Sequence, residues 1–169
     1  MSSMQIRQAI RDDIAALFQL SCDAHQQAPY TELIPASERQ RFLAAFSPGS
    51  RFETRFREKM ERFIDSPNAR VYVAEVDGKI AGYRMAERAG TQLMLHGLFV
   101  DARYRGMGIG RELFTKPLAD VLPGDTVLLT VLRGNAHARR LYESEGFVVT
   151  RESPRTFYGA EQDEMMLKK

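Results

Sequence analysis

The sequence predicts an α+β fold built on a mixed, mostly antiparallel sheet of six or seven strands flanked by helices. Two β-rich runs meet at Asp77-Gly78, a strong hairpin signal because a type I′ turn needs positive φ at both positions. An apolar run over residues 93–100 leads through a glycine-rich segment into a helical pattern, and an apolar strand over residues 126–132 follows. A strand–helix–strand path of this kind favours a right-handed crossover between two parallel central strands.

The chain begins with a strand and a helix. Apolar and polar residues alternate over residues 4–10, which predicts a short opening strand. Asp12 or Asp13 then offers an N-cap for a first helix, which ends before Pro29.

Two further helices are expected before the main sheet. Residues 30–35 are expected to form a loop, residues 37–46 a short helix and residues 51–64 a longer one. The longer helix has an apolar stripe for the core and a charged outer face, where acid–base pairs four residues apart favour a solvated helix. These pairs are Glu53 with Arg57 and Glu58 with Arg62.

The sheet is expected to form from three successive strands. Residues 69–76, 79–87 and 92–100 form an antiparallel meander. The helix after the glycine-rich segment contains Pro117, which predicts a kink or an early end. The strand over residues 126–132 is apolar throughout, as expected for a strand covered on both faces.

The end of the chain supplies a capped helix and the closing strands. Asn135 is a natural N-cap for a helix over residues 136–145, and Gly146 suits its C′ position. Two strands, joined by a polar loop, complete the sheet. Their expected ranges are 147–152 and 163–168, and that of the loop is 153–162.

The glycine-rich segment reads Arg105-Gly106-Met107-Gly108-Ile109-Gly110. Its glycines let the backbone approach a ligand and point several N–H groups one way, and the next helix adds the positive end of its dipole. The pattern favours a pyrophosphate seat, with a plain tight turn as the alternative. A P-loop is disfavoured because Arg111-Glu112, and not Lys with a hydroxyl residue, follows Gly110. The spacing also differs from that of the dinucleotide fingerprint.

A second motif lies downstream, with Asn135, Ala138, Tyr142, Gly146 and Phe147 in the pattern Asn-x-x-Ala-x-x-x-Tyr-x-x-x-Gly-Phe. Together with Arg105, Gly108 and Gly110, it resembles the acetyl-coenzyme A signature of the GNAT superfamily of N-acyltransferases. The resemblance covers residues 69–147 closely and the earlier helices only in general plan. It implies a GNAT-like sheet whose central parallel strands splay apart around acetyl-CoA.

The resemblance implies a role for each motif. Acetyl-CoA would be the co-substrate, and no metal is expected. The end of the central strand would pair with the pantetheine amides and polarise the thioester carbonyl. Asn135 would bind pantetheine, and Tyr142 would give a proton to the departing thiolate; the alternative for Tyr142 is a core aromatic. The expected cofactor-binding residues are Leu98, Phe99, Val100, Arg105, Gly106, Met107, Gly108, Ile109, Gly110, Arg111 and Asn135.

The general base is not determined by the motifs. Many relatives place a glutamate at the position of Met94, so the common base is absent here. His96 points to the same side of the strand and has a suitable ordinary pKa, and it is our first candidate. A packed strand histidine is the alternative. Glu87 and Tyr83 on the adjoining strand are weaker candidates.

Length and composition limit the class of protein. The 169 residues suit a single N-acetyltransferase domain over residues 1–169, and the net charge of +2 does not favour nucleic acid as a general partner. One cysteine, Cys22, excludes an internal disulfide and suits a reducing cytoplasm, and the scattered histidines give no metal-ligand spacing. No apolar run is long enough to cross a membrane.

The sequence therefore predicts direct acetyl transfer from acetyl-CoA to a primary amine, with a small molecule as the favoured acceptor. Two alternatives stay open: a non-catalytic coenzyme A-binding sensor or partner module, and a protein N-terminal or lysine acetyltransferase. His25, Tyr30 and Glu32 could recognise an amine or be ordinary loop residues. The acceptor, the acyl-chain preference and the oligomeric state are not readable, although the resemblance admits a homodimer.

Overall fold

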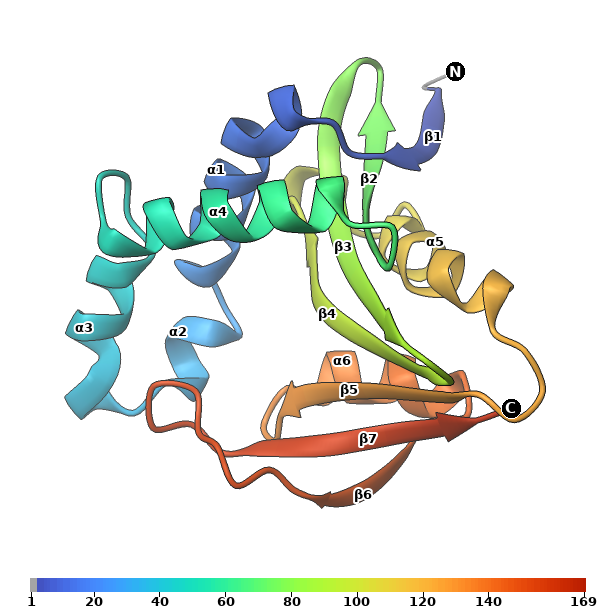
Figure 1. Ribbon diagram of the computed structural model, residues 1–169. Helices are drawn as coiled ribbons and strands as arrows, with labels where there is room; N and C mark the ends of the chain where they lie inside the picture. Colours follow the sequence, from blue (N-terminus) through green and yellow to red (C-terminus); the bar gives the residue numbers. More distant parts are fainter. Residues whose placement is uncertain (1–2) are drawn as a thin grey trace.

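The computed structural model describes residues 3–169 and forms a seven-stranded sheet in the order β1-β2-β3-β4-β5-β7-β6 (Figure 1). The strands are β1 Met4–Gln8, β2 Ala69–Val76, β3 Lys79–Ala89, β4 Gln92–Val100, β5 Thr126–Leu132, β6 Val148–Glu152 and β7 Gln162–Lys168. The helices are α1 Ile14–His25, α2 Tyr30–Leu33, α3 Ala36–Ala45, α4 Arg51–Asp65, α5 Ile109–Thr115 and α6 Ala136–Ser144.

The predicted sheet is confirmed in type and in its central feature. All neighbouring strands are antiparallel except β4 and β5, which are parallel. The β2–β3 turn has φ of 49° at Asp77 and 77° at Gly78, as the type I′ hairpin requires. The crossover from β4 to β5 runs through α5, which places the glycine-rich segment at the carboxyl end of β4 (Figure 1).

Each face of the sheet has its own helices and its own apolar cluster. On one face α1 and α4 pack against β2 and β3, with Leu17, Phe56 and Met60 among the buried residues. On the other face α5 and α6 pack against β4 and β5, around Phe114 and Phe147. The two clusters leave the sheet between two helical layers, and α2 and α3 lie beyond the carboxyl end of β5 (Figure 1).

Two local predictions are confirmed by the helix ends. The α5 helix ends at Thr115, and a 3-10 helix over Lys116–Asp120 carries Pro117, because proline cannot donate the next helical hydrogen bond. Asn135 caps α6 by accepting a hydrogen bond from the Ala138 N–H at 3.2 Å, and Gly146 beyond its end has a φ of 92°.

Three local predictions are wrong. The expected loop over residues 30–35 contains the short helix α2, whose hydrogen bonds begin at the carbonyl of Pro29. The expected Glu53–Arg57 and Glu58–Arg62 ion pairs do not form among the described residues. The carboxylate of Glu53 instead accepts a hydrogen bond from the Gly49 N–H at 2.6 Å, which satisfies the turn before α4.

The third error concerns β5. Its apolar sequence suggested a strand covered on both faces, but Thr130 is exposed and Leu128 is half-buried. The face with Val127, Leu129 and Val131 lies in the core against α6, whereas on the opposite face Leu132, at the end of the strand, is buried against α3. The opposite face of β5 is therefore partly open.

Replacing Asp13 with alanine is expected to destabilise the fold by about 1–3 kcal/mol, because its carboxylate accepts charge-assisted hydrogen bonds. Its donors are the Arg7 guanidinium, at 2.8 and 3.0 Å, and the Ile10 N–H, at 2.8 Å. Arg7 lowers the pKa of Asp13, so this stabilisation is present above the unfolded value of about 3.9 and is lost as pH falls through the folded value. Urea unfolding of wild type and variant at pH 7 and pH 3 measures the loss of stability and its dependence on pH. An equal loss of stability at the two pH values would contradict the pH dependence.

Candidate active site

The centre of the sheet is split. The parallel strands β4 and β5 pair only from Gln92 with Thr126 to Leu95 with Leu129. Beyond these pairs β4 stays bonded to β3, and β5 to β7, so the facing edges of the two strands diverge (Figure 1). The predicted splayed pair is therefore present, and backbone groups of β4 beyond Leu95 face the split without a strand partner.

A β-bulge marks the start of the split. The register of β3 and β4 shifts between Arg84 and Met85, so that Gly97 is the extra residue. Gly97 has a φ of 29°, and a Cβ there would lie 2.8 Å from the ring of Phe99. Bulges bend a strand and re-aim its side chains. This one leaves His96 and Phe99 toward the α1 and α4 side and Leu98 toward the α5 and α6 side.

The glycine-rich segment presents free backbone donors at the wide end of the split. Gly106 and Gly108 both have a φ of 80°, and a Cβ at either position would meet no atom within 4 Å. Glycine is therefore needed there for the backbone conformation. Within residues 3–169, the N–H groups from Gly106 to Gly110 have no acceptor, whereas the Gly108 carbonyl accepts from Arg111 and Glu112. Such a run of unpaired donors is suited to an anion.

Arg105 begins the glycine-rich segment and Arg111 follows it, and the two differ in their contacts. Arg105 is exposed. Arg111 is also exposed, and its guanidinium lies 3.0 Å from the carboxylate of Glu145, the residue that follows α6. Arg111 therefore joins the start of α5 to the end of α6, so it has a structural contact that the sequence did not predict.

Tyr142 and Asn135 occupy one side of the split through α6. Tyr142 is 8% exposed, and its ring lies 5.1 Å from that of Phe114 and 6.4 Å from that of Phe147. The side-chain oxygen of Asn135 is used as the helix cap, which leaves its amide N–H₂ as the free donor. Tyr142 thus belongs to the aromatic core, and a charged group, Arg84, lies over the same Phe114 ring.

Arg84 is a residue that sequence reasoning missed. It lies on β3 opposite Leu98, is 2% exposed, and stacks over the ring of Phe114 at 5.1 Å. Burial lowers the pKa of the guanidinium, and the neighbouring Tyr142 raises it. The available signal was an arginine at an inward position of an apolar strand, between Tyr83 and Met85.

The candidate bases lie on the face of the sheet that α4 covers. His96 packs edge-on against Phe63 with ring centroids 5.6 Å apart, and its Nε2 is 3.6 Å from a carboxylate oxygen of Glu87. Burial and, next, the charge of Lys59 lower the pKa of His96, so the imidazole is neutral at pH 7. Glu87 is exposed and lies directly opposite Met94 in the register. Its carboxylate thus stands beside Met94, the position at which the resemblance led us to expect a glutamate base.

Tyr83 is fully packed and differs from these two groups. It is 1% exposed, and burial raises the pKa of its hydroxyl above its usual range. It would hold its proton at neutral pH. Among the candidates named from the sequence, the structure brings together only His96 and Glu87.

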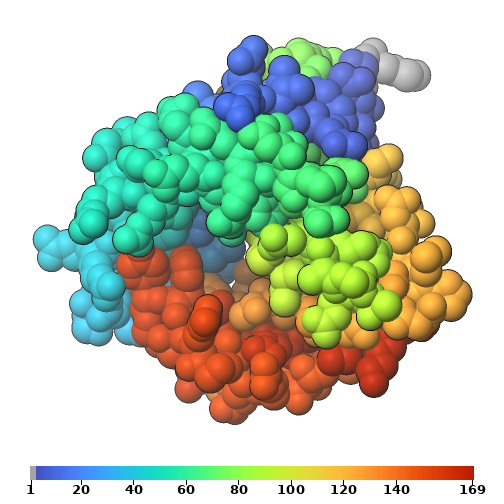
Figure 2. All heavy atoms as spheres, in the orientation of Figure 1, coloured from blue at the N-terminus to red at the C-terminus, as the bar shows by residue number. Residues whose placement is uncertain are grey.

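The surface next to these groups is hollowed. Figure 2 shows a depression between α4, the end of the β3–β4 hairpin and the chain around β6 and β7. The cross-strand register places Met94, Leu128 and Met166 in one row on one face of the sheet. All three are half-buried, so this face offers an apolar floor beside Glu87.

The acceptor candidates from the first helices are mostly core residues. His25 is 4% exposed and stacks on Phe46 with centroids 3.8 Å apart. Its Nδ1 lies 2.7 Å from the Ser21 carbonyl, and burial lowers its pKa to about 4. Tyr30 packs on His25 at 4.6 Å, whereas Glu32 is exposed. His25 is therefore a neutral packing residue at pH 7.

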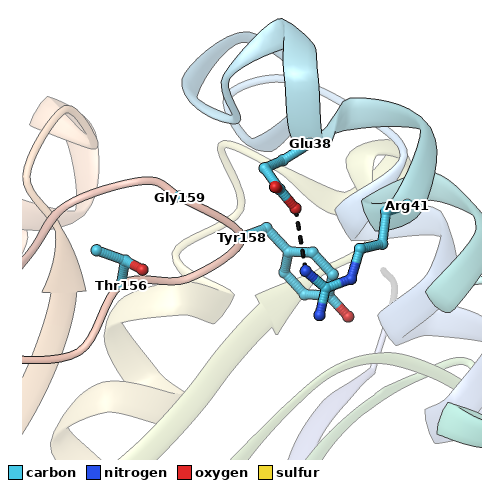
Figure 3. Close-up of a pocket in the computed structure, with 5 residues that line it drawn as sticks. All are labelled: Glu38, Arg41, Thr156, Tyr158 and Gly159. Atoms are coloured by element: carbon cyan, nitrogen blue, oxygen red, sulfur yellow. Dashed lines mark hydrogen bonds and ion pairs between the residues drawn. The ribbon is translucent and has the colours of Figure 1, made fainter.

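A separate hollow of about 380 Å³ lies between α3 and the segment joining β6 to β7 (Figure 3). Arg41 stacks over the Tyr158 ring at 5.5 Å and pairs with Glu38 at 3.2 Å. Phe157 and Tyr158 also join the aromatic cluster around Phe42, so the segment expected to be a polar loop is partly apolar. None of the residues expected to bind acetyl-CoA lines this hollow.

The fold and these motifs define a class of protein. The profile of the acetyltransferase (GNAT) domain matches residues 20–169. The chain therefore belongs to the GNAT acetyltransferase family. Within the described residues no helix is long and apolar enough to cross a membrane, and no group of three or more His, Cys, Asp or Glu side chains is placed to hold a metal ion.

Two curated relatives are similar over part of the chain. One is the N-alpha-acetyltransferase RimI of Mycobacterium tuberculosis, 36% identical over 90 residues that make up 51% of this chain and 56% of the relative. The other is N-alpha-acetyltransferase 40 of Saccharomyces cerevisiae, which is 34% identical over 91 residues. This match covers 48% of this chain and 32% of the relative. The matched part thus spans about half of the first relative and a third of the second.

Solved structures share the whole fold. The PaiA N-acetyltransferase of Thermoplasma acidophilum, in complex with coenzyme A, has a TM-score of 0.76 at 17% identity, with 99% of both chains covered. The ribosomal-protein-S18-alanine N-acetyltransferase of Escherichia coli has a TM-score of 0.68 at 20% identity, with 98% of this chain and 93% of that chain covered. At these identities the likeness concerns the fold.

Proposed function

We propose that this protein transfers an acetyl group directly from acetyl-CoA to a primary amine. The observation that carries the proposal is the split between β4 and β5, which combines an unpaired strand edge with the free N–H groups from Gly106 to Gly110. Structures of this fold with coenzyme A or acetyl-CoA bound support the same cofactor here. Residues 1–169 would form one N-acetyltransferase domain.

The cofactor would be held along its length. The loop N–H groups would hold the pyrophosphate, with Arg105 and Arg111 at its edge. The edge of β4 over Leu98, Phe99 and Val100 would pair with the pantetheine amides as an added strand. The Asn135 amide would donate a further hydrogen bond. This arrangement would direct the thioester toward the bulge at Gly97.

The reaction would proceed without a covalent enzyme intermediate. The amine would lose a proton to His96 or Glu87 and attack the thioester carbonyl, whose oxygen would be stabilised by a β4 N–H group. Tyr142 would protonate the departing thiolate. Cys22 is a poor alternative nucleophile, since it is buried and burial raises the pKa of its thiol to about 11.

The acceptor is proposed at the level of its chemistry. A primary amine fits, with a small molecule as the first candidate. The names of the two curated relatives favour an N-terminal α-amino group as the second. Both would approach over the row of Met94, Leu128 and Met166. A coenzyme A-binding module without transferase activity is the competing function, favoured by Met94 at the usual base position.

An assay of free thiol release tests the proposal. Wild-type protein with acetyl-CoA is incubated with a panel of small primary amines and short peptides, and the release of coenzyme A is followed. We expect amine-dependent release. Binding of acetyl-CoA without release on any amine would favour the binding module.

We further propose a cytoplasmic location, since the single cysteine is a free thiol, and a homodimer. Cell fractionation tests the location, and light scattering tests the oligomeric state.

Replacing His96 with alanine is expected to lower kcat/KM for the amine by about 100-fold at pH 7, since a positioned base contributes at least that much. The pKa of His96 is lowered, so the acidic limb of the pH profile should lie below its ordinary value of about 6.5. Glu87 raises the pKa of His96, so Glu87→Gln should move this limb to lower pH. An unchanged profile in both variants would remove His96 from the mechanism.

A further inference from the structure

Arg84 is a buried cation with little to neutralise it. It is 2% exposed, and no carboxylate among residues 3–169 lies within ion-pair distance of its guanidinium. Its Nε–H donor also has no hydrogen-bond partner there. An uncompensated buried charge and an unmade hydrogen bond both destabilise a fold. A residue of this kind is expected to serve the site in which it lies.

Arg84 lies where the reaction is proposed to occur. It pairs with Leu98 across the bulge, just past the point where β4 leaves β5. Its guanidinium lies over the Phe114 ring, which also contacts Tyr142. It therefore lies on the α5 and α6 side of the sheet, at the start of the split.

The polar neighbours of Arg84 are few. From α6 the neighbour is Tyr142, whose ring packs on the same Phe114 ring as the guanidinium and which raises the pKa of Arg84. From β4 the nearest titratable group is His96, whose protonation the guanidinium disfavours. On β2 the paired residue is Tyr72, a buried aromatic. Among these titratable groups, Tyr142 is thus the one that favours the charged form of Arg84.

We propose that Arg84 is a positioning residue that orients the Tyr142 hydroxyl and balances its charge when Tyr142 gives its proton to the thiolate of coenzyme A. The inference rests on the proposed acetyl transfer. In that step the C–N bond forms and the C–S bond breaks. The electron pair of the broken bond stays on sulfur, which takes the Tyr142 proton. The amine's proton passes to His96 or Glu87, and water returns a proton to Tyr142.

The need for Arg84 follows from the surroundings of Tyr142. A phenolate between the rings of Phe114 and Phe147 would be a buried anion, which is strongly unfavourable without a cation in contact. Arg84 supplies that cation before the reaction starts, so no reorganisation is required at the moment of proton transfer. The same neighbours make a neutral residue at position 84 compatible with packing but not with this step.

A double-mutant cycle tests the proposal. Arg84→Met, Tyr142→Phe and the double variant are compared with wild type for kcat, using acetyl-CoA and the amine of the panel that gives the fastest thiol release. We expect Arg84→Met alone to lower kcat about 30-fold, within the range of coupling between contacting groups. In the Tyr142→Phe background the same change should lower kcat by less than about threefold. Equal losses in both backgrounds would overturn the proposal.

Two further readouts separate positioning from structure and from binding. The Kd for acetyl-CoA should stay within about threefold of wild type, and Arg84→Lys should restore most of kcat because it keeps the charge. A Kd raised tenfold with kcat unchanged at saturation would instead make Arg84 a cofactor ligand. Arg70→Met is the control: Arg70 lies on β2 and, within the part of the chain that the structure describes, donates only to local carbonyls. If Arg84→Met does not fold, the Arg84→Lys and Arg84→Gln pair carries the comparison. Absence of thiol release by wild type would count against the proposed function itself.

Discussion

Replacing Tyr142 with phenylalanine is expected to lower kcat by about 100- to 1,000-fold, since it removes the general acid of the proposed reaction. The aromatic ring stays between Phe114 and Phe147, so the packing of α6 against α5 is kept. The change should therefore act on kcat and leave the Kd for acetyl-CoA nearly unchanged. Steady-state thiol release and calorimetry measure the two quantities, and thermal unfolding checks the fold.

The matched control for this variant is Tyr72→Phe. Tyr72 is as buried as Tyr142, but it lies on β2, away from the split. Its hydroxyl has no part in the proposed reaction, so kcat should stay at the wild-type level. If Tyr142→Phe also keeps wild-type kcat, Tyr142 is a core aromatic and another group protonates the thiolate.

Replacing Gly108 with valine is expected to raise the Kd for acetyl-CoA by about 100-fold or more. Gly108 has a φ of 80°, a conformation that a β-branched residue strongly disfavours. The change would turn the neighbouring N–H groups away from the pyrophosphate. Hydrogen bonds to a charged group contribute about 1.5–3 kcal/mol each, so the loss of two accounts for this factor.

Gly49→Val is the matched control for the loop variant. Gly49 has a φ of 78°, and a Cβ there would also meet no atom within 4 Å, but it lies in the turn between α3 and α4. Both variants should lose a similar amount of stability, measured by urea unfolding. Only Gly108→Val should weaken acetyl-CoA binding. An equal effect of the two on the Kd would mean that the loop does not hold the pyrophosphate.

Local sequence signals were sufficient for much of the sheet. The Asp77-Gly78 turn, the Asn135 cap and Pro117 each act within a few residues, and the structure agrees with the prediction at all three. The parallel pair of β4 and β5 followed from the strand–helix–strand order, because chain connectivity restricts the handedness and direction of the second strand.

Features that depend on contacts between distant residues could not be predicted. The short α2 was expected to be a loop, and Gly134 lies against it so closely that a Cβ would be 2.3 Å from Leu33. Phe157 and Tyr158 stand in a polar stretch, yet they join an aromatic cluster formed by α3. The burial of these two side chains depends on tertiary packing, which local propensity does not predict.

The candidate site shows the same division. The loop and α6 motifs could be read because their spacing is local. Predicting that Glu87 lies near His96 required the register of β3 and β4. That register could have been obtained by counting back along the hairpin from the pair of Ala89 and Gln92. Arg84 on β3 and Tyr142 on α6 both pack on the Phe114 ring, and this proximity could be found only from the structure.

The most direct test of the account is a titration of ¹⁵N-labelled protein with acetyl-CoA, followed by the backbone amide resonances. We expect saturable shifts at Gly106 to Gly110 and along the β4 edge from Leu98 to Val100, with a Kd in the micromolar range, which corresponds to about 8 kcal/mol of binding free energy. The amides of β1 at the far edge of the sheet should not shift. Two results would contradict the cofactor site and, with it, the proposed activity. One is the absence of shifts up to about 1 mM ligand, a concentration that corresponds to about 4 kcal/mol of binding free energy. The other is a set of shifts confined to other segments.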